Sequence, residues 1–151
     1  MIKVMFICHG NICRSPMAQS IFTHLLKQQK LESNFIIDSS ATSREETNNP
    51  PHIRTKKILE KNNIRLINHF SKRITKNEAK DFDYLICMDN NNIKNLKSII
   101  EKCEYPKVSL LLSYANINRD IRDPWYTNYF GATFDDIYLG CAALLNNLTK
   151  K

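Results

Sequence analysis

Short apolar runs alternate with amphipathic segments along most of this chain. Short runs ended by polar or turn-forming residues are typical of buried strands, whereas apolar residues three or four positions apart predict helices. The expected strands cover residues 2–7, 35–37, 84–88 and 108–112. Helical spacing appears near residues 16–26, 53–62, 93–100 and 134–148. This alternation predicts an α/β domain, in which a central parallel sheet of about four strands has helices on both faces, in three layers.

Neither an internal repeat nor a Gly/Ser-rich linker divides the chain. Its 151 residues therefore predict a single domain, residues 1–151, large enough to bury a core without disulfides or metal ions. The first apolar run breaks near His9, too early for a signal peptide, and no run is long enough to span a membrane. We therefore expect a cytoplasmic protein with no membrane partner.

The polar composition narrows the expected ligands. Five cysteines without a Cys-x-x-Cys pair and four dispersed histidines favour neither a disulfide framework nor a zinc site, so we expect no metal and no cofactor. The net charge of +7 fits a solvated, lysine-rich surface or attraction of anionic substrates. We expect no nucleic-acid partner, because no basic run is interleaved with aromatics. The pattern does not indicate an oligomeric state.

The loop from Cys8 to Ser15 lies between the first strand and a helix whose first turn contains Pro16. Ligands of parallel sheets bind at this place, beyond the carboxyl ends of the strands. Consecutive backbone N–H groups and a helix N-terminus can bind the oxygens of a phosphoryl group. Gly10 would allow close approach of the backbone and an unusual φ, and Asn11 tolerates the left-handed region. The planar fork of Arg14 can hold two phosphate oxygens.

Cys8 is the candidate nucleophile of this loop. A helix N-terminus and a cationic neighbour lower the pKa of a cysteine, and the Ser15 hydroxyl could donate a hydrogen bond to the thiolate. A Cys-x5-Arg pattern alone is weak, because Cys8 could be a small buried residue at a strand end with Arg14 exposed on a helix. The strand before the loop and Pro16 after it favour the phosphate-binding interpretation.

Asp123 is the candidate general acid, because a departing phenolate needs a proton donor near its oxygen. Pro124 restricts Asp123 to extended backbone, and Trp125 and Tyr126 could flank a phenyl ring. An Asp-Pro pair is often only a turn, so the residues alone leave both interpretations open.

Both segments resemble the signature of the low-molecular-weight protein-tyrosine phosphatases. The resemblance runs nearly end to end, and its most specific motifs are Cys8-x-Gly10-Asn11-Ile12-Cys13-Arg14-Ser15-Pro16-Met17-Ala18 and Asp120-Ile121-Arg122-Asp123-Pro124-Trp125-Tyr126. It implies that Cys8 is the nucleophile, that Arg14 binds phosphate and that Asp123 is the general acid and base. It also implies that Ser15 supports the thiolate and that Asn11 orders the loop.

The resemblance also implies a reaction: hydrolysis of phosphotyrosine esters in a protein or peptide. The intermediate is a phosphocysteine, the product is phosphate, and neither a metal nor a cofactor takes part. His9, Gly10, Ile12 and Cys13 are then the other members of the phosphate-binding loop. The family also suggests a reversible, redox-sensitive disulfide between Cys8 and Cys13.

The chain departs from the family pattern at three places. Glu45-Glu46 stands where many members have an aromatic residue followed by His, Trp125 replaces the first of two tyrosines, and Arg122 replaces a common Pro. Glu45, Trp125 and Tyr126 are therefore expected to line the substrate cleft. The glutamates would form an acidic cleft wall that selects different peptides or, alternatively, a solvated loop.

Three other functions stay open. Arsenate reductases with this fold need two further relay cysteines, for which Cys87 and Cys103 are poorly placed. Protein-arginine phosphatases resemble this chain but carry Thr where it has Ile12, so Ile12 favours phosphotyrosine. A non-catalytic phosphate-binding module would not need the nucleophile, the arginine and the acid together.

Two further polar residues are given structural roles. Asp89 stands at a strand–helix junction, where aspartates commonly accept backbone hydrogen bonds, so we expect a helix cap. His69 is expected to be buried and hydrogen-bonded rather than to act as an acid or a ligand.

Overall fold

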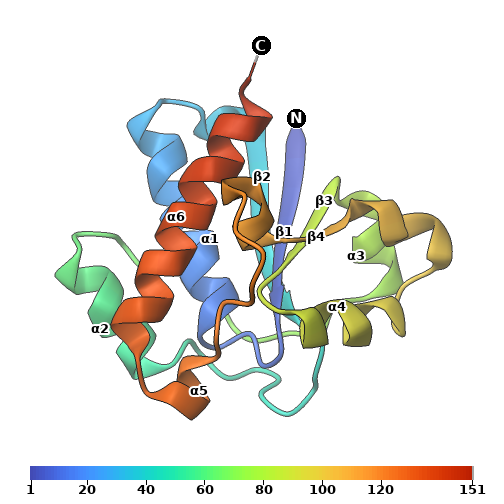
Figure 1. Ribbon diagram of the computed structural model, residues 1–151, viewed down its shortest axis with the longest axis horizontal. Helices are drawn as coiled ribbons and strands as arrows, with labels where there is room; N and C mark the ends of the chain where they lie inside the picture. The colour runs from blue at the N-terminus through green and yellow to red at the C-terminus, as the bar shows by residue number, and fades with distance from the viewer. Residues whose placement is uncertain (151) are drawn as a thin grey trace.

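A four-stranded parallel sheet forms the centre of the protein, which a computed structural model describes for residues 1–150 (Figure 1). The strands are β1 Ile2–Cys8, β2 Phe35–Ala41, β3 Tyr84–Cys87 and β4 Val108–Leu110, in the spatial order β2-β1-β3-β4. The helices are α1 Arg14–Gln28, α2 Ile53–Lys61, α3 Lys76–Asp81, α4 Asn90–Lys97, α5 Pro124–Thr127 and α6 Phe130–Leu148. The predicted α/β architecture is confirmed.

β1 supplies side chains to two separate cores because it lies between β2 and β3. Successive side chains of a strand point to opposite faces of the sheet. Val4 and Phe6 pack in the core that α1 and α6 cover, whereas Met5 and Ile7 pack in the core under α3 and α4 (Figure 1). One continuous apolar run therefore fills both faces, as is usual for a central parallel strand.

Two boundaries differ from the sequence prediction around the sheet. The strand expected at residues 108–112 ends at Leu110, and a 3-10 helix covers Leu111–Ala115. Leu111 and Leu112 are buried there, so their apolar character reflects packing and not pairing in the sheet. In contrast, β2 continues through polar residues to Ala41, because these residues pair with the second half of β1.

The helices also differ from the sequence prediction, most clearly at two short helices and at the start of the last one. α3 has six residues, too few for a clear apolar period, and a capping box of Thr75 and Glu78 starts it. That pair was a signal available in the sequence. α5 covers Pro124–Thr127, where no helix was predicted, and α6 begins at Phe130, four residues before the predicted start at residue 134. Among residues 1–150, no helix has the length and apolar character needed to cross a membrane.

Close packing of α6 against the 3-10 helix depends on Gly140. A Cβ atom at Gly140 would lie 2.6 Å from Cγ of Leu111, a side chain that is fully buried and cannot swing aside. At Gly131, on the same helix, a Cβ atom would meet nothing within 4 Å. The two glycines are therefore a matched pair for measuring the cost of overpacking.

We expect Gly140→Ala to lower the free energy of unfolding by about 1–3 kcal/mol, because the clash outweighs the better helix propensity of alanine. Gly131→Ala should leave stability unchanged or raise it by up to about 1 kcal/mol. Urea unfolding followed by circular dichroism measures both values. Equal effects of the two substitutions would contradict this account of the packing.

Candidate active site

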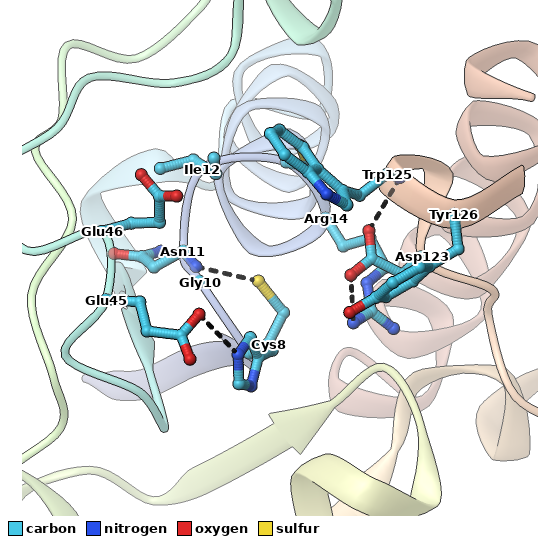
Figure 2. A pocket seen from close by; sticks show the side chains of 12 residues that line it. Cys8, Gly10, Asn11, Ile12, Arg14, Glu45, Glu46, Asp123, Trp125 and Tyr126 are labelled. Carbon is cyan, nitrogen blue, oxygen red and sulfur yellow. Dashed lines mark hydrogen bonds and ion pairs between the residues drawn. The ribbon is translucent and has the colours of Figure 1, made fainter. Parts of the chain in front are cut away.

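The cavity with the candidate nucleophile opens at the carboxyl ends of the strands, where β1 ends at Cys8 and α1 begins at Arg14 (Figure 2). Eleven of the twelve side chains predicted for the site line this cavity, and the twelfth, Ser15, lies buried beneath the loop. Glu45 and Glu46 form one side of the cavity, and Asp123, Trp125 and Tyr126 form the other. The lining residues are Cys8, His9, Gly10, Asn11, Ile12, Cys13, Arg14, Glu45, Glu46, Asp123, Trp125 and Tyr126.

The sulfur of Cys8 has two polar contacts within the loop. It lies 3.0 Å from Oγ of Ser15, and the backbone N–H of Asn11 donates to it at 3.2 Å. The side-chain amide of Asn11 also donates to Oγ of Ser15 at 2.7 Å. Because that bond uses a lone pair of the serine oxygen, the hydroxyl proton is left to point at the sulfur. The sulfur thus lies among polar groups at the N-terminus of α1.

Asn11 holds the loop in shape. Its φ of 57° lies in the left-handed region, as expected for this residue. Its side chain donates to Oγ of Ser39 on β2 at 3.1 Å and accepts from Nε2 of His69 at 2.7 Å. The fully buried amide thus links the loop to two other segments, and a buried amide without partners would be costly.

Gly10 differs from the expectation. No glycine among residues 1–150 has a positive φ, so the predicted unusual φ at Gly10 is wrong, and the left-handed residue is Asn11. A Cβ atom at Gly10 would lie 3.4 Å from Cγ of Glu46, while the Gly10 carbonyl accepts from Oγ of Ser71 at 2.7 Å. That distance is an ordinary van der Waals contact, so Glu46 packs closely over Gly10 without requiring a glycine there.

Arg14 is buried, with a side chain only 2% exposed, so the alternative of an exposed helix arginine is wrong. Its Nη1 donates to Oδ2 of Asp89 at 2.6 Å and to the carbonyl of Ile121 at 2.8 Å, and Nη2 lies 3.6 Å from Oδ2 of Asp123. Burial alone would lower the pKa of Arg14, but the nearby Cys8 and Asp89 raise it above its ordinary value. The guanidinium therefore stays positive beside the cavity.

Asp89 combines a predicted role with one that the sequence analysis missed. As expected, it caps a helix: it accepts from the N–H of Asn92 at 2.7 Å, at the start of α4. Its other carboxylate oxygen binds Arg14. A signal for this ion pair was available, because Asp89 follows β3, the strand beside β1, at the same edge of the sheet. The carbonyl of Ile121 was also missed.

Asp123 stands at the N-cap of α5, with its carboxylate toward Arg14 (Figure 2). Oδ1 accepts from the N–H of Trp125 at 3.0 Å, which leaves Oδ2 on the side of the guanidinium. The preceding residues are tied to the β3–α4 junction, because the N–H of Ile121 donates to the carbonyl of Met88 at 2.9 Å. The Asp-Pro pair therefore forms a turn, which was one of its two interpretations. It also places a carboxylate in the cavity, which the other interpretation requires.

The other residues of the loop and rim differ in exposure. Trp125 and Tyr126 are 60% and 84% exposed, so both present aromatic surface at the mouth of the cavity. Cys13 is buried, and burial together with the nearby Cys8 and Asp123 raises its pKa to about 12. All five cysteines are free thiols, and the Cys8–Cys13 disulfide stays a prediction. Among residues 1–150, no cluster of three or more His, Cys, Asp or Glu side chains could hold a metal ion.

Comparisons with known proteins agree with this geometry. A family model described as low molecular weight phosphotyrosine protein phosphatase matches residues 3–151. The protein of that description from Gallus gallus is 38% identical over 153 residues, covering 99% of this chain and 94% of the relative. The low molecular weight protein-tyrosine-phosphatase YfkJ of Bacillus subtilis is 36% identical over 153 residues, covering 100% of this chain and 98% of the relative.

Solved structures extend the likeness to three dimensions. The crystal structure of YfkJ matches with a TM-score of 0.95 at 36% identity, over 99% of this chain and 96% of that chain. A Drosophila arginine phosphatase matches with a TM-score of 0.90 at 29% identity, over 99% of both chains. A free thiol in the loop between β1 and α1 of a parallel sheet is the central feature of this site. The chain belongs to the low molecular weight phosphotyrosine protein phosphatase family, and it is a phosphatase.

His69 provides a test of the network around Asn11. It is hydrogen-bonded, as expected, but it is partly rather than fully buried, with a side chain 9% exposed. Burial lowers its pKa, and Lys72 acts in the same direction, whereas Asp38 opposes them. A pKa lower in the folded than in the unfolded chain means that folding favours the neutral ring. The neutral His69 ring therefore contributes its full stabilisation at pH values above the pKa that His69 has in the unfolded chain. That stabilisation is lost as the pH falls below this pKa toward the lower pKa of the folded chain.

We expect the wild-type protein to lose stability between about pH 7.5 and about pH 5, and His69→Gln to lose less over the same range. Glutamine keeps a donor for Asn11 but does not titrate. Urea unfolding at both pH values measures the difference. An equally large loss in the variant would show that another group causes the pH dependence.

Proposed function

We propose that this protein hydrolyses phosphotyrosine esters in proteins or peptides through a phosphocysteine intermediate on Cys8. The observation that carries the proposal is that one cavity contains a thiol at a helix N-terminus, a permanently charged guanidinium and a carboxylate. These are a nucleophile, a group that binds phosphate and a proton donor. The family implies phosphoprotein substrates, and the roles of the single residues are our inference from geometry and resemblance.

In the first step, the Cys8 thiolate attacks phosphorus in line with the leaving phenol oxygen. The S–P bond forms as the P–O bond breaks, and Asp123 gives its proton to the departing oxygen. The transition state of phosphoryl transfer is loose, so positioning and charge stabilisation supply most of the rate. Backbone N–H groups of the loop and the Arg14 guanidinium would hold the equatorial oxygens.

In the second step, water attacks the phosphocysteine. Asp123, now a carboxylate, takes a proton from that water, and the S–P bond breaks to release phosphate and the thiolate. Ser15 and the N–H of Asn11 lie against the sulfur and would stabilise it as a leaving group. The reaction ends with Cys8 ionised and Asp123 protonated, ready for the next substrate.

Ile12 supports an aryl phosphate as the substrate. Its side chain lines the cavity and offers no hydroxyl or amide to a guanidinium, whereas the exposed faces of Trp125 and Tyr126 suit a phenyl ring. The match to an arginine phosphatase makes phosphoarginine the competing substrate to test. Arsenate reduction has less support, because Cys87 is fully buried and burial raises its pKa far above the ordinary value. The cytoplasmic location stays a prediction.

Cys8→Ser tests the nucleophile. We expect it to remove turnover of p-nitrophenyl phosphate and of phosphotyrosine peptides, because an alcohol is a far weaker nucleophile than a thiolate at neutral pH. Binding of inorganic phosphate, measured by calorimetry, should remain. Cys103→Ser, an exposed cysteine away from the cavity, is the matched control and should turn over normally. Wild-type activity in Cys8→Ser, or a preference of the wild-type protein for phosphoarginine, would overturn the proposal.

Asp123→Asn tests the general acid. Asparagine can still cap α5, but it has no carboxyl proton to give. We expect the first step to slow by about 10²–10⁴-fold, most strongly for phenols that are poor leaving groups. Rates for a series of aryl phosphates of increasing leaving-group pKa measure this dependence. A uniform loss over the series would mean that Asp123 acts only by shaping the loop.

A further inference from the structure

Two glutamates face the catalytic cavity without a lysine or arginine partner. Among residues 1–150, neither Glu45 nor Glu46 forms an ion pair with a lysine or arginine, and the Glu45 carboxylate lies 3.4 Å from Nε2 of His9. The Glu45 side chain is 74% exposed. Figure 2 shows both glutamates on the side of Cys8 opposite Trp125 and Tyr126. Carboxylates in this setting are free to meet a charge on the substrate.

The backbone that carries these glutamates is attached to the phosphate-binding loop. The N–H of Thr42 donates to the carbonyl of Cys8 at 3.0 Å, and the N–H of Ser43 donates to the carbonyl of His9 at 3.1 Å. The Glu45 N–H donates to Oγ of Ser43 at 3.0 Å. The acidic wall, defined as Glu45 and Glu46, therefore keeps its position relative to the nucleophile.

The side chain of Glu46 is held over the loop entrance. Its Oε2 accepts from the side-chain amide of Asn49 at 2.6 Å, and its Cγ lies against Gly10. A Cβ atom at position 10 would meet Cγ of Glu46 at 3.4 Å, an ordinary van der Waals contact, so the Glu46 side chain packs closely over the loop.

Neither Arg44 nor Arg14 forms an ion pair with the acidic wall. Arg44 precedes it in the chain but lines a separate hollow with Arg73 and Lys76. Arg14 lines the cavity but is almost fully buried and already bound to Asp89. Although the whole chain carries a net charge of +7, the accessible charge at this wall is negative. Local charge, and not net charge, acts on a substrate residue within a Debye length of about 8–10 Å.

We propose that the acidic wall selects phosphotyrosine sites with a lysine or arginine next to the phosphotyrosine. This inference rests on the proposed function and names the substrate class. With the phosphoryl group in the loop and the ring beside Trp125 and Tyr126, flanking residues of the peptide pass the rim of the cavity, where a cationic side chain can pair with Glu45 or Glu46. An acidic flank is repelled there.

The test compares phosphotyrosine peptides that differ only in flanking residues: lysine, alanine or glutamate, placed before or after the phosphotyrosine. We expect kcat/KM of the wild-type protein to be about three- to tenfold higher for the lysine peptide than for the glutamate peptide on at least one side, the range for one or two exposed ion pairs. The preference should shrink at about 0.5 M salt, because exposed charges are screened.

Variants separate charge from shape. Glu45→Gln with Glu46→Gln keeps the oxygen that accepts from Asn49 but removes both charges, and should bring the lysine-to-glutamate ratio close to one. Taking the ratio within each variant cancels any uniform change in activity. Glu32→Gln, an exposed glutamate in the 3-10 turn before β2 at the opposite edge of the sheet, is the matched control and should keep the wild-type ratio.

The outcomes are distinct for the two proposals. Equal kcat/KM for all peptides, a preference for glutamate, or a lysine preference that survives in the double variant overturns the acidic-wall inference and leaves the proposed function in place. Failure of the wild-type protein to hydrolyse any of the phosphotyrosine peptides overturns the proposed function and this inference with it.

Discussion

The buried guanidinium of Arg14 is the interaction on which the arrangement of this site depends. A buried charge is tolerated only when it is paired and hydrogen-bonded, so the chain has to bring acceptors to it. Asp89 at the end of β3 supplies one, and the carbonyl of Ile121 supplies another. Asp123 follows Ile121 by two residues, so the same contact that satisfies the arginine places the proposed acid. Removing the charge would leave acceptors from two distant segments without their common partner.

The loop itself depends on a second buried polar group, the side chain of Asn11. Its backbone is left-handed, its N–H donates to the Cys8 sulfur, and its side-chain amide contacts Ser15, Ser39 and His69. These contacts run from the nucleophile to β2 and to the segment after α2. Because every member of such a network must be satisfied, the loop has one stable geometry before a substrate arrives. A preformed geometry of this kind is what electrostatic stabilisation of a phosphoryl group requires.

The sequence predicted which strands and helices form more accurately than it predicted where they end. It also predicted the residues of the site more accurately than the contacts between them. The apolar run at residues 2–7 predicted a buried strand, and this is β1 between β2 and β3, because burial on both faces requires continuous apolar residues. The end of β4 was missed because Leu111 is equally apolar in a 3-10 helix that packs on α6. The unusual φ was expected at Gly10 and falls on Asn11, since either residue tolerates that conformation and only the network decides which one adopts it.

The sequence by itself determined the α/β class, the position of the Cys8 loop at a strand end, and the candidates for nucleophile, arginine and acid. These follow from local chemistry: apolar spacing, a short loop before a helix, and residue types suited to binding phosphate. Only the tertiary structure decided that Arg14 is buried against Asp89, and that Asp123, more than a hundred residues later, faces it. It also decided that Glu45 and Glu46 form one wall of the cavity. Such contacts depend on how distant segments pack, which no local pattern encodes.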